Sequence, residues 1–128
     1  MMTSFPHKID HIGIPVRDIS VSKHFYAQAL APVGMAMLGA SERHAAFGIE
    51  PMPYLIIRLT DQRPVSVHLA FVAETRAQVD AFYAAALAAG GTDYGGPGLR
   101  PDYHPDYYGA FVLDPDGHNI EMVKHAPE

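Results

Sequence analysis

The chain has 128 residues, of which 48% are hydrophobic and 18% charged, so it can bury the core of one ordinary domain and is not expected to be disordered. It contains no cysteine, which excludes disulfides, thiolate metal sites and a cysteine nucleophile. The formal net charge of −5, without any basic run, disfavours nucleic acid or an anionic membrane surface as a partner. The first ten residues lack the apolar core of a signal peptide, and the longest apolar stretch, 81–89, is too short to span a bilayer. We therefore expect a cytoplasmic protein.

The first half of the chain predicts one strand, one helix and three further strands. In residues 8–16 apolar side chains alternate with small and polar ones, which is typical of a half-buried strand. Asp18 or Ser20 is suited to cap a helix that runs to about residue 31 and is ended by Pro32. Turn-forming residues then separate three short strands at 33–38, 44–49 and 54–59.

The second half predicts the same order of elements. Residues 65–73 alternate like the first strand, and Thr75 is suited to cap a helix that ends at Gly90 and Gly91. A short strand at 92–94 is followed by a loop rich in glycine and proline that continues to residue 106. The last two strands, 107–113 and 118–124, are joined as a hairpin by a turn at 114–117.

An internal repeat relates the two halves. A shift of 57 residues places His11 on His68, and a shift of 64 in the later part of each half places Ile56 on Ile120. Self-similarity at a fixed offset indicates repeated architecture, and two copies are too few for a solenoid. We therefore predict one α+β domain, residues 1–128, made of two paired βαβββ modules at roughly 7–60 and 65–125.

A metal site is the main functional prediction from the residues themselves. The alternation places His11 and His68 on the strand faces opposite the residues that pack against the helices. Glu121 lies in a mostly apolar strand, where a buried carboxylate is costly unless it is paired or bound to a metal. Two imidazoles and one carboxylate leave coordination positions open for substrate oxygens and suit divalent Fe, Mn, Ni, Co or Zn. The alternative for each histidine alone is a hydrogen-bonded side chain of the partial core.

Three motifs carry a resemblance to a known family. They are DHIGIPVRD at 10–18, VHLAFVA at 67–73 and FVLDPDGHNIEMV at 111–123. The chain resembles the vicinal oxygen chelate superfamily, which includes glyoxalase I, extradiol dioxygenases, fosfomycin-resistance enzymes, methylmalonyl-CoA epimerase and bleomycin-resistance proteins. The resemblance implies an open cup-shaped mixed sheet with the helices outside and a divalent metal held by His11, His68 and Glu121. It also implies a homodimer, in some members with a site completed by both subunits.

Departures of this sequence from the superfamily's ligand pattern narrow the type of reaction. Glyoxalase I and the epimerase use a fourth protein ligand from the last strand of the first module. The internal repeat places Ile57 at that position, and the local glyoxalase pattern places Arg58 there. Neither side chain supplies an oxygen ligand, so the three-ligand set is more similar to that of dioxygenases and fosfomycin-type transferases.

Proton transfer is assigned to residues near the rim of the cup. The active-site tyrosine of the dioxygenases would fall at Phe111, so a nearby tyrosine must replace it. A two-residue turn would place Tyr108 on the same face as Glu121, and a bulge would place Tyr107 there instead. His104 lies in the loop before this strand and is suited to acid–base chemistry. Its alternative is a solvent-facing turn residue.

The function expected from the sequence is a metal-dependent enzyme that acts on a small oxygen-chelating substrate. Dioxygenase, lyase or isomerase, and thiol-transferase chemistry remain open. The alternative is a non-catalytic protein of the bleomycin-resistance type that binds or sequesters a small molecule. The glycine-rich stretch 95–98 is not a phosphate loop, because it lacks the lysine and the following helix. We expect the remaining histidines on the surface: His7, His24, His44, His118 and His125.

Overall fold

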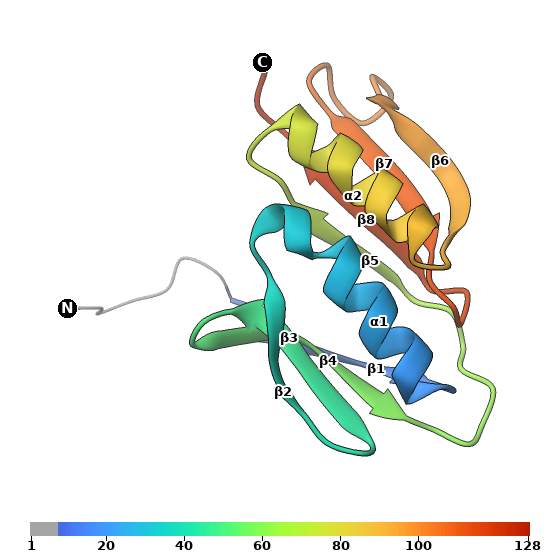
Figure 1. The fold of residues 1–128 in the computed structure, drawn as a ribbon. Helices are drawn as coiled ribbons and strands as arrows, with labels where there is room; N and C mark the ends of the chain where they lie inside the picture. Colours follow the sequence, from blue (N-terminus) through green and yellow to red (C-terminus); the bar gives the residue numbers. More distant parts are fainter. Residues whose placement is uncertain (1–7) are drawn as a thin grey trace.

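Two four-stranded mixed sheets, each with one α-helix, make up the molecule (Figure 1). The computed structural model describes residues 8–128. The first seven residues, which include the start of the first predicted module, His7 and most of the segment considered as a signal peptide, lie outside the described part. The architecture confirms the α+β class and is consistent with two βαβββ modules.

The first sheet has the strand order β1-β4-β3-β2, with β1 parallel to β4 and the other pairs antiparallel. Its helix α1 begins after Asp18, whose carboxylate accepts a hydrogen bond from the Val21 N–H at 3.1 Å and so caps the first turn. A short 3₁₀ helix that contains Pro32 follows. The elements are β1 (Ile12–Val16), α1 (Ile19–Ala29), the 3₁₀ helix (Ala31–Val33), β2 (Ala36–Ala40), β3 (His44–Ile49) and β4 (Met52–Leu59).

The second sheet repeats this arrangement with the order β5-β8-β7-β6, again with its first and last strands parallel. Thr75 and Gln78 form a capping box at the start of its helix. The helix ends before Gly90, which adopts a φ of 104° that favours glycine. The elements are β5 (His68–Val72), α2 (Arg76–Ala88), β6 (Thr92–Leu99), β7 (Tyr108–Leu113) and β8 (Asn119–Lys124).

The core lies between the helices and one face of each sheet. The helices α1 and α2 contact each other and run side by side in Figure 1. The aromatic rings of Phe25, Tyr26 and Phe82 are fully buried among alternate strand residues. The other face of the sheets is open, as the exposed His68 shows. Within residues 8–128, no helix is both long and apolar enough to cross a membrane.

The glycine-rich stretch was predicted as a loop, and this prediction is wrong. Residues 95–98 belong to β6, which pairs with β7 as far as Leu99 opposite Tyr108. Two register shifts interrupt the pairing, and Gly95 adopts a φ of 147°. Glycine and proline are depleted in regular strands, so composition favoured a loop. The irregular strand forms because β7 offers a backbone partner and glycine tolerates the shifts.

His118 was expected on the surface, and the structure shows it fully buried. Its Nδ1 accepts a hydrogen bond from the Val67 N–H at 3.1 Å, which leaves Nε2 as the proton carrier. Nε2 donates to the Pro15 carbonyl at 2.9 Å. The imidazole therefore joins the hairpin before β8 to β1 in the other sheet and to the segment before β5.

Candidate functional site

A histidine–glutamate pair lies on the open face of the second sheet. In the parallel pairing of β5 with β8, His68 is opposite Asn119 and Ala70 is opposite Glu121. The side chains of His68 and Glu121 therefore point to the same face, and His68 Nε2 lies 2.9 Å from Glu121 Oε1. The glutamate is 2% exposed, whereas half of the histidine side chain is exposed. The buried carboxylate is thus in contact with an imidazole that is itself accessible to solvent.

Asn119 orients that imidazole. Its side-chain amide lies 2.7 Å from His68 Nδ1, so Nε2 is the ring atom directed at Glu121. Asn119 Oδ1 is buried without a hydrogen-bond partner among the described residues. A half-turn of the amide places this oxygen on an Nδ1–H and frees the Nε2 lone pair. In a histidine that binds a metal through one ring nitrogen, the other ring nitrogen usually donates a hydrogen bond to a neighbouring acceptor.

Tyr107 holds the second oxygen of the carboxylate. Its hydroxyl donates a hydrogen bond to Glu121 Oε2, and burial together with this bond raises the pKa of Tyr107 well above its ordinary value. The antiparallel register places Phe111, not Ala110, opposite Glu121. The register expected from a two-residue turn is therefore wrong by one residue, and the alternative with Tyr107 beside Glu121 is the observed one.

Tyr108 consequently points to the opposite face of β7. Its hydroxyl donates to Asp80 of α2 at 2.7 Å, and the Arg76 guanidinium lies over its ring. The hydrogen bond to Asp80 is the main cause that raises the pKa of Tyr108. The structure thus brings Tyr107, and not Tyr108, to the carboxylate.

His104 lies at the rim, one aromatic contact away from the carboxylate. Its Nδ1 accepts a hydrogen bond from the Asp106 N–H at 3.2 Å, and its Nε2 lies 3.0 Å from His125 Nδ1. The His104 ring meets the Tyr107 ring edge to face, with 5.4 Å between the ring centres. The described contacts therefore place His104 next to the residue that holds Glu121, without a hydrogen bond between them.

His11 immediately precedes β1, the edge strand of the other sheet. Its Nδ1 donates to Asp10 Oδ2 at 2.7 Å, which leaves the Nε2 lone pair available. No group of three histidine, aspartate or glutamate side chains in residues 8–128 is arranged to hold a metal. Within a single chain, two of the three predicted ligands, His68 and Glu121, are thus in contact, whereas His11 lies at the first sheet.

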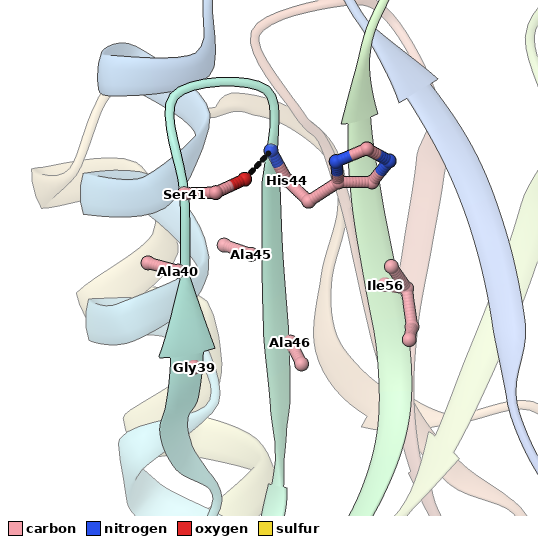
Figure 2. A pocket seen from close by; sticks show the side chains of 7 residues that line it. All are labelled: Gly39, Ala40, Ser41, His44, Ala45, Ala46 and Ile56. Carbon is pink, nitrogen blue, oxygen red and sulfur yellow. Dashed lines mark hydrogen bonds between the residues drawn. The ribbon is translucent and has the colours of Figure 1, made fainter.

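The counterpart of Glu121 in the first sheet is Ile56. Gly13 pairs with Ile56 as Ala70 pairs with Glu121, so the offset between β4 and β8 is 65 residues rather than 64. Ile57 is fully buried toward the helices. In Figure 2 the Ile56 side chain lies beside the His44 ring, in a shallow hollow of about 330 Å³ that is lined mainly by small residues. The placement of Ile57 at the ligand position was therefore wrong, although neither isoleucine supplies a donor.

The same registers place Arg58 on the open face. Arg58 pairs with Pro15 and His44, two residues beyond Ile56, and its Nη1 would lie 4.0 Å from a Cβ on Gly13. Had Ile57 occupied the ligand position, strand alternation would have turned Arg58 to the opposite face. Since Ile57 faces the helices, Arg58 faces away from them.

A larger cavity, of about 750 Å³, lies between the start of β1 and the free edge strand β5. Its lining is mainly apolar and includes Ile12, Met35, Tyr54, Ala70 and Val72.

The observed donors fit a divalent metal. Two ligand atoms bound side by side at about 2.1 Å are about 3 Å apart, which matches the separation of His68 Nε2 and Glu121 Oε1. His11 presents Nε2 in the same manner, with Nδ1 held by a neighbouring side chain. Imidazole and carboxylate together suit Fe, Mn, Co, Ni and Zn rather than a soft metal.

An α+β molecule with two similar halves and a histidine–carboxylate pair on an open sheet face belongs to a recognisable class. The sequence profile of the Glyoxalase/Bleomycin resistance protein/Dioxygenase superfamily matches residues 8–122, and the chain belongs to this superfamily. Its members commonly use a divalent metal and bind small molecules. No match was found among curated proteins.

Solved structures show the same fold. A glyoxalase/bleomycin resistance protein from Albidiferax ferrireducens is 30% identical, with a TM-score of 0.78 over 89% of this chain and 96% of that one. A glyoxalase-related enzyme from Fulvimarina pelagi is 22% identical, with a TM-score of 0.73 over 91% and 87% of the two chains. A glyoxalase/bleomycin resistance protein/dioxygenase family enzyme from Burkholderia phytofirmans is 19% identical, with a TM-score of 0.72 over 94% and 100%.

Sequence reasoning missed Asn119. It lies two residues before Glu121 in β8, and a period of two places both side chains on one face. That spacing was available as a signal, but the partner of Asn119 depends on the pairing of β8 with β5.

Proposed function

We propose that this protein is a divalent-metal-dependent enzyme acting on a small substrate with adjacent oxygen atoms. The observation that carries the proposal is the buried Glu121 carboxylate, with His68 Nε2 2.9 Å from one oxygen and the Tyr107 hydroxyl on the other. Removing a carboxylate from water is costly, and a protein keeps one at an open face mainly where its charge is used. In this role a bound metal polarises the substrate oxygens and stabilises developing negative charge.

The side chains around the pair have distinct tasks in this proposal. Asn119 fixes the His68 ring, and Tyr107 fixes Glu121 and keeps its own proton because its pKa is raised. His104 transfers protons at the rim, since its half-buried ring lies against Tyr107. Tyr108, bound to Asp80 on the helix side, is proposed only as a support for the position of β7.

The third ligand, His11, is proposed to come from a second copy of the chain. Both β1 and β5 are edge strands with unpaired backbone groups, so each is able to face an edge of another copy. The apolar cavity between them would be covered in the process. A homodimer would then carry two sites, each with His11 of one subunit and His68 and Glu121 of the other.

Metal content tests the proposed ligands. The protein is purified without nickel affinity, and bound metal is measured after equilibration with Fe(II), Mn(II), Co(II), Ni(II) or Zn(II). About one metal per chain is expected for the wild type, and none for His11→Ala or Glu121→Gln. His24→Ala is the matched control, since His24 is exposed on α1, on the helix side of the sheets. A wild type that binds none of these metals would overturn the metalloenzyme proposal.

Mixed dimers then locate the third ligand. A heterodimer of His11→Ala with Glu121→Gln subunits has one intact site if ligands are shared, and is expected to bind one metal per dimer. If all three ligands belonged to one chain, each subunit of the heterodimer would lack one, and no metal would bind.

A binding protein without catalysis is the second candidate. The apolar lining of the 750 Å³ cavity favours it, because such a surface suits a mainly apolar ligand. Tight binding of an apolar dye to metal-free protein, displaced by small hydrophobic compounds, would support this function. Loss of that binding on dimerisation would instead assign the cavity to the subunit interface.

A further inference from the structure

Arg100 lies on the same open face as the candidate site. It follows β6, and its Cζ lies over the Phe111 ring, 5.4 Å from the ring centre. Phe111 is the register partner of Glu121, and the His68 ring meets it edge to face at 6.1 Å. One phenyl ring therefore separates the guanidinium from the histidine of the proposed centre.

The glycines of β6 make room for this guanidinium. A Cβ on Gly98 would lie 3.2 Å from Arg100 Nη1, and a Cβ on Gly95 would lie 3.3 Å from Nη2 and 3.1 Å from Phe111 Cδ1. All three distances are tighter than ordinary packing, so a side chain at either position would require Arg100 or Phe111 to shift by a few tenths of an ångström. Nη2 also donates to the Gly96 carbonyl at 2.7 Å, which fixes the plane of the guanidinium. The glycine-rich stretch thus forms a seat for Arg100.

The charge of Arg100 is not neutralised by a neighbour. Within residues 8–128 no carboxylate forms an ion pair with it, and its one side-chain hydrogen bond goes to a neutral carbonyl. A guanidinium carries five N–H donors, so most of them remain available. A half-buried, oriented cation therefore faces the space beside Glu121.

We propose that Arg100 is a specificity-determining residue that binds a carboxylate group of the substrate. The proposal rests on the proposed function, since the adjacent oxygens of the same substrate would lie at His68 and Glu121. A guanidinium binds a carboxylate through two parallel hydrogen bonds, and the Phe111 ring between Arg100 and His68 sets the distance between the two ends of the substrate. The substrate class is thus a compact molecule with adjacent oxygens at one end and a carboxylate at the other.

A matched pair of probes tests the proposal. Protocatechuate carries two adjacent hydroxyls and a carboxylate, and protocatechuamide differs only in having a neutral amide in place of the carboxylate. Binding is measured by calorimetry, and the Arg100 Nε–H signal is followed by NMR and assigned by its loss in Arg100→Gln. Each titration is done with Zn(II) and again with EDTA. Arg43→Gln is the control, because Arg43 is exposed and donates to the Leu59 carbonyl in the first sheet.

Wild type and Arg43→Gln are expected to bind the carboxylate at least about tenfold more tightly than the amide, with a shift of the Arg100 signal. Arg100→Gln is expected to lose that preference, and Arg100→Lys to keep part of it. An Arg100 signal that does not move with protocatechuate, or an unchanged preference in a folded Arg100→Gln, would overturn the proposal.

The metal arm separates this proposal from the proposed function. Binding of the carboxylate probe that depends on Arg100 but is the same in Zn(II) and EDTA would support the carboxylate site and contradict the metal-dependent chemistry. Binding that depends on Zn(II) but is equal for the two probes would support the metal-dependent chemistry and contradict the carboxylate site.

Discussion

Glu121→Gln should separate stability from metal binding. The substitution keeps the volume of a side chain that is 2% exposed and removes its charge. The Tyr107 hydroxyl retains an oxygen acceptor, and only the contact with His68 Nε2 must be rearranged. The substitution leaves no buried cation unpaired, because half of the His68 side chain is exposed to solvent.

The expected magnitudes follow from these contacts. Hydrogen bonds to a charged group contribute about 1.5–3 kcal/mol each, while burying a carboxylate costs several kcal/mol. The two effects largely offset each other, so the free energy of unfolding of the metal-free protein should change by less than about 1.5 kcal/mol in either direction. Loss of the anionic ligand should weaken metal binding by more than about 100-fold, or about 2.7 kcal/mol.

The assay measures both quantities on the same samples. Urea unfolding in EDTA gives the free energy of unfolding of metal-free protein, and calorimetry with Zn(II) or Mn(II) gives the metal affinity. Glu42→Gln is the matched control, since Glu42 is exposed in the β2–β3 connection and should change neither quantity. Metal affinity equal to that of the wild type, or a loss of more than about 3 kcal/mol of stability without metal, would refute the reasoning. The second outcome would make Glu121 a structural anchor rather than a ligand.

Three further predictions concern single positions. Burial raises the pKa of Tyr107 in the folded protein above its unfolded value of about 10. Its stabilising effect is therefore complete below about pH 10 and is lost as the pH rises toward the folded pKa. The difference in unfolding free energy between wild type and Tyr107→Phe should be smaller at about pH 11 than at about pH 8. His118→Ala should cost about 3 kcal/mol in urea unfolding, since it removes a fully buried side chain and leaves two partly buried backbone groups unpaired, whereas exposed His24→Ala should cost less than about 0.5 kcal/mol. Equal costs would contradict this role. Gly91→Ala should cost about 1–3 kcal/mol, because its Cβ would meet core side chains at 2.5 and 2.8 Å, while Gly39→Ala, with no atom within 4 Å, serves as the control.

Local signals predicted most elements of the fold. Thr75 was predicted as the cap of the second helix and Asp18 as one of two candidates for the first, because capping depends on residues within one turn. The strand at 44–49 was predicted with its observed bounds, and the last strand within one residue, because period-two alternation is also local. β6 was shortened in the prediction because its pairing with β7 depends on a distant partner.

Register was the main source of error at the site. A two-residue turn flanked by Asp114 and Gly117 would place Ala110 opposite Glu121, but Leu113 pairs with Asn119, so the connection spans residues 114–118. A slip of one residue turns every side chain of a strand to the other face, which exchanged Tyr108 for Tyr107. The connection is held by Asp114, which accepts hydrogen bonds from the backbone N–H groups of Asp116 and His118. That network depends on the buried position of Asp114 and is not evident from composition.

The same reasoning explains the exchange of Ile57 for Ile56. The shift of 64 residues came from aligning the hairpin strands, whereas the ligand position is defined by pairing with the first strand of each half. The pairing of the hairpin strands also gives an offset of 65, since Ala46 pairs with Ile56 as Phe111 pairs with Glu121, so the shift of 64 followed residue identities and not strand pairing. Sequence repeats therefore identify equivalent elements more reliably than equivalent faces.

The two halves have the same topology but unequal chemistry. The second sheet carries a buried carboxylate, an oriented imidazole, a phenol and an arginine on one face, whereas the first carries His11 and an apolar Ile56 at the position of Glu121. A half that supplies only one imidazole binds no metal well alone, and two ligands from the other half bind only weakly. In the proposed site, the half that supplies His11 therefore completes the ligand set of the half that supplies His68 and Glu121. Both β1 and β5 are edge strands, so the proposed approach of a second copy requires no sheet to open. The proposed ligands were found from the sequence because alternation places them on a strand face, whereas the proposed second copy is argued from strand edges and a cavity that only the folded chain presents.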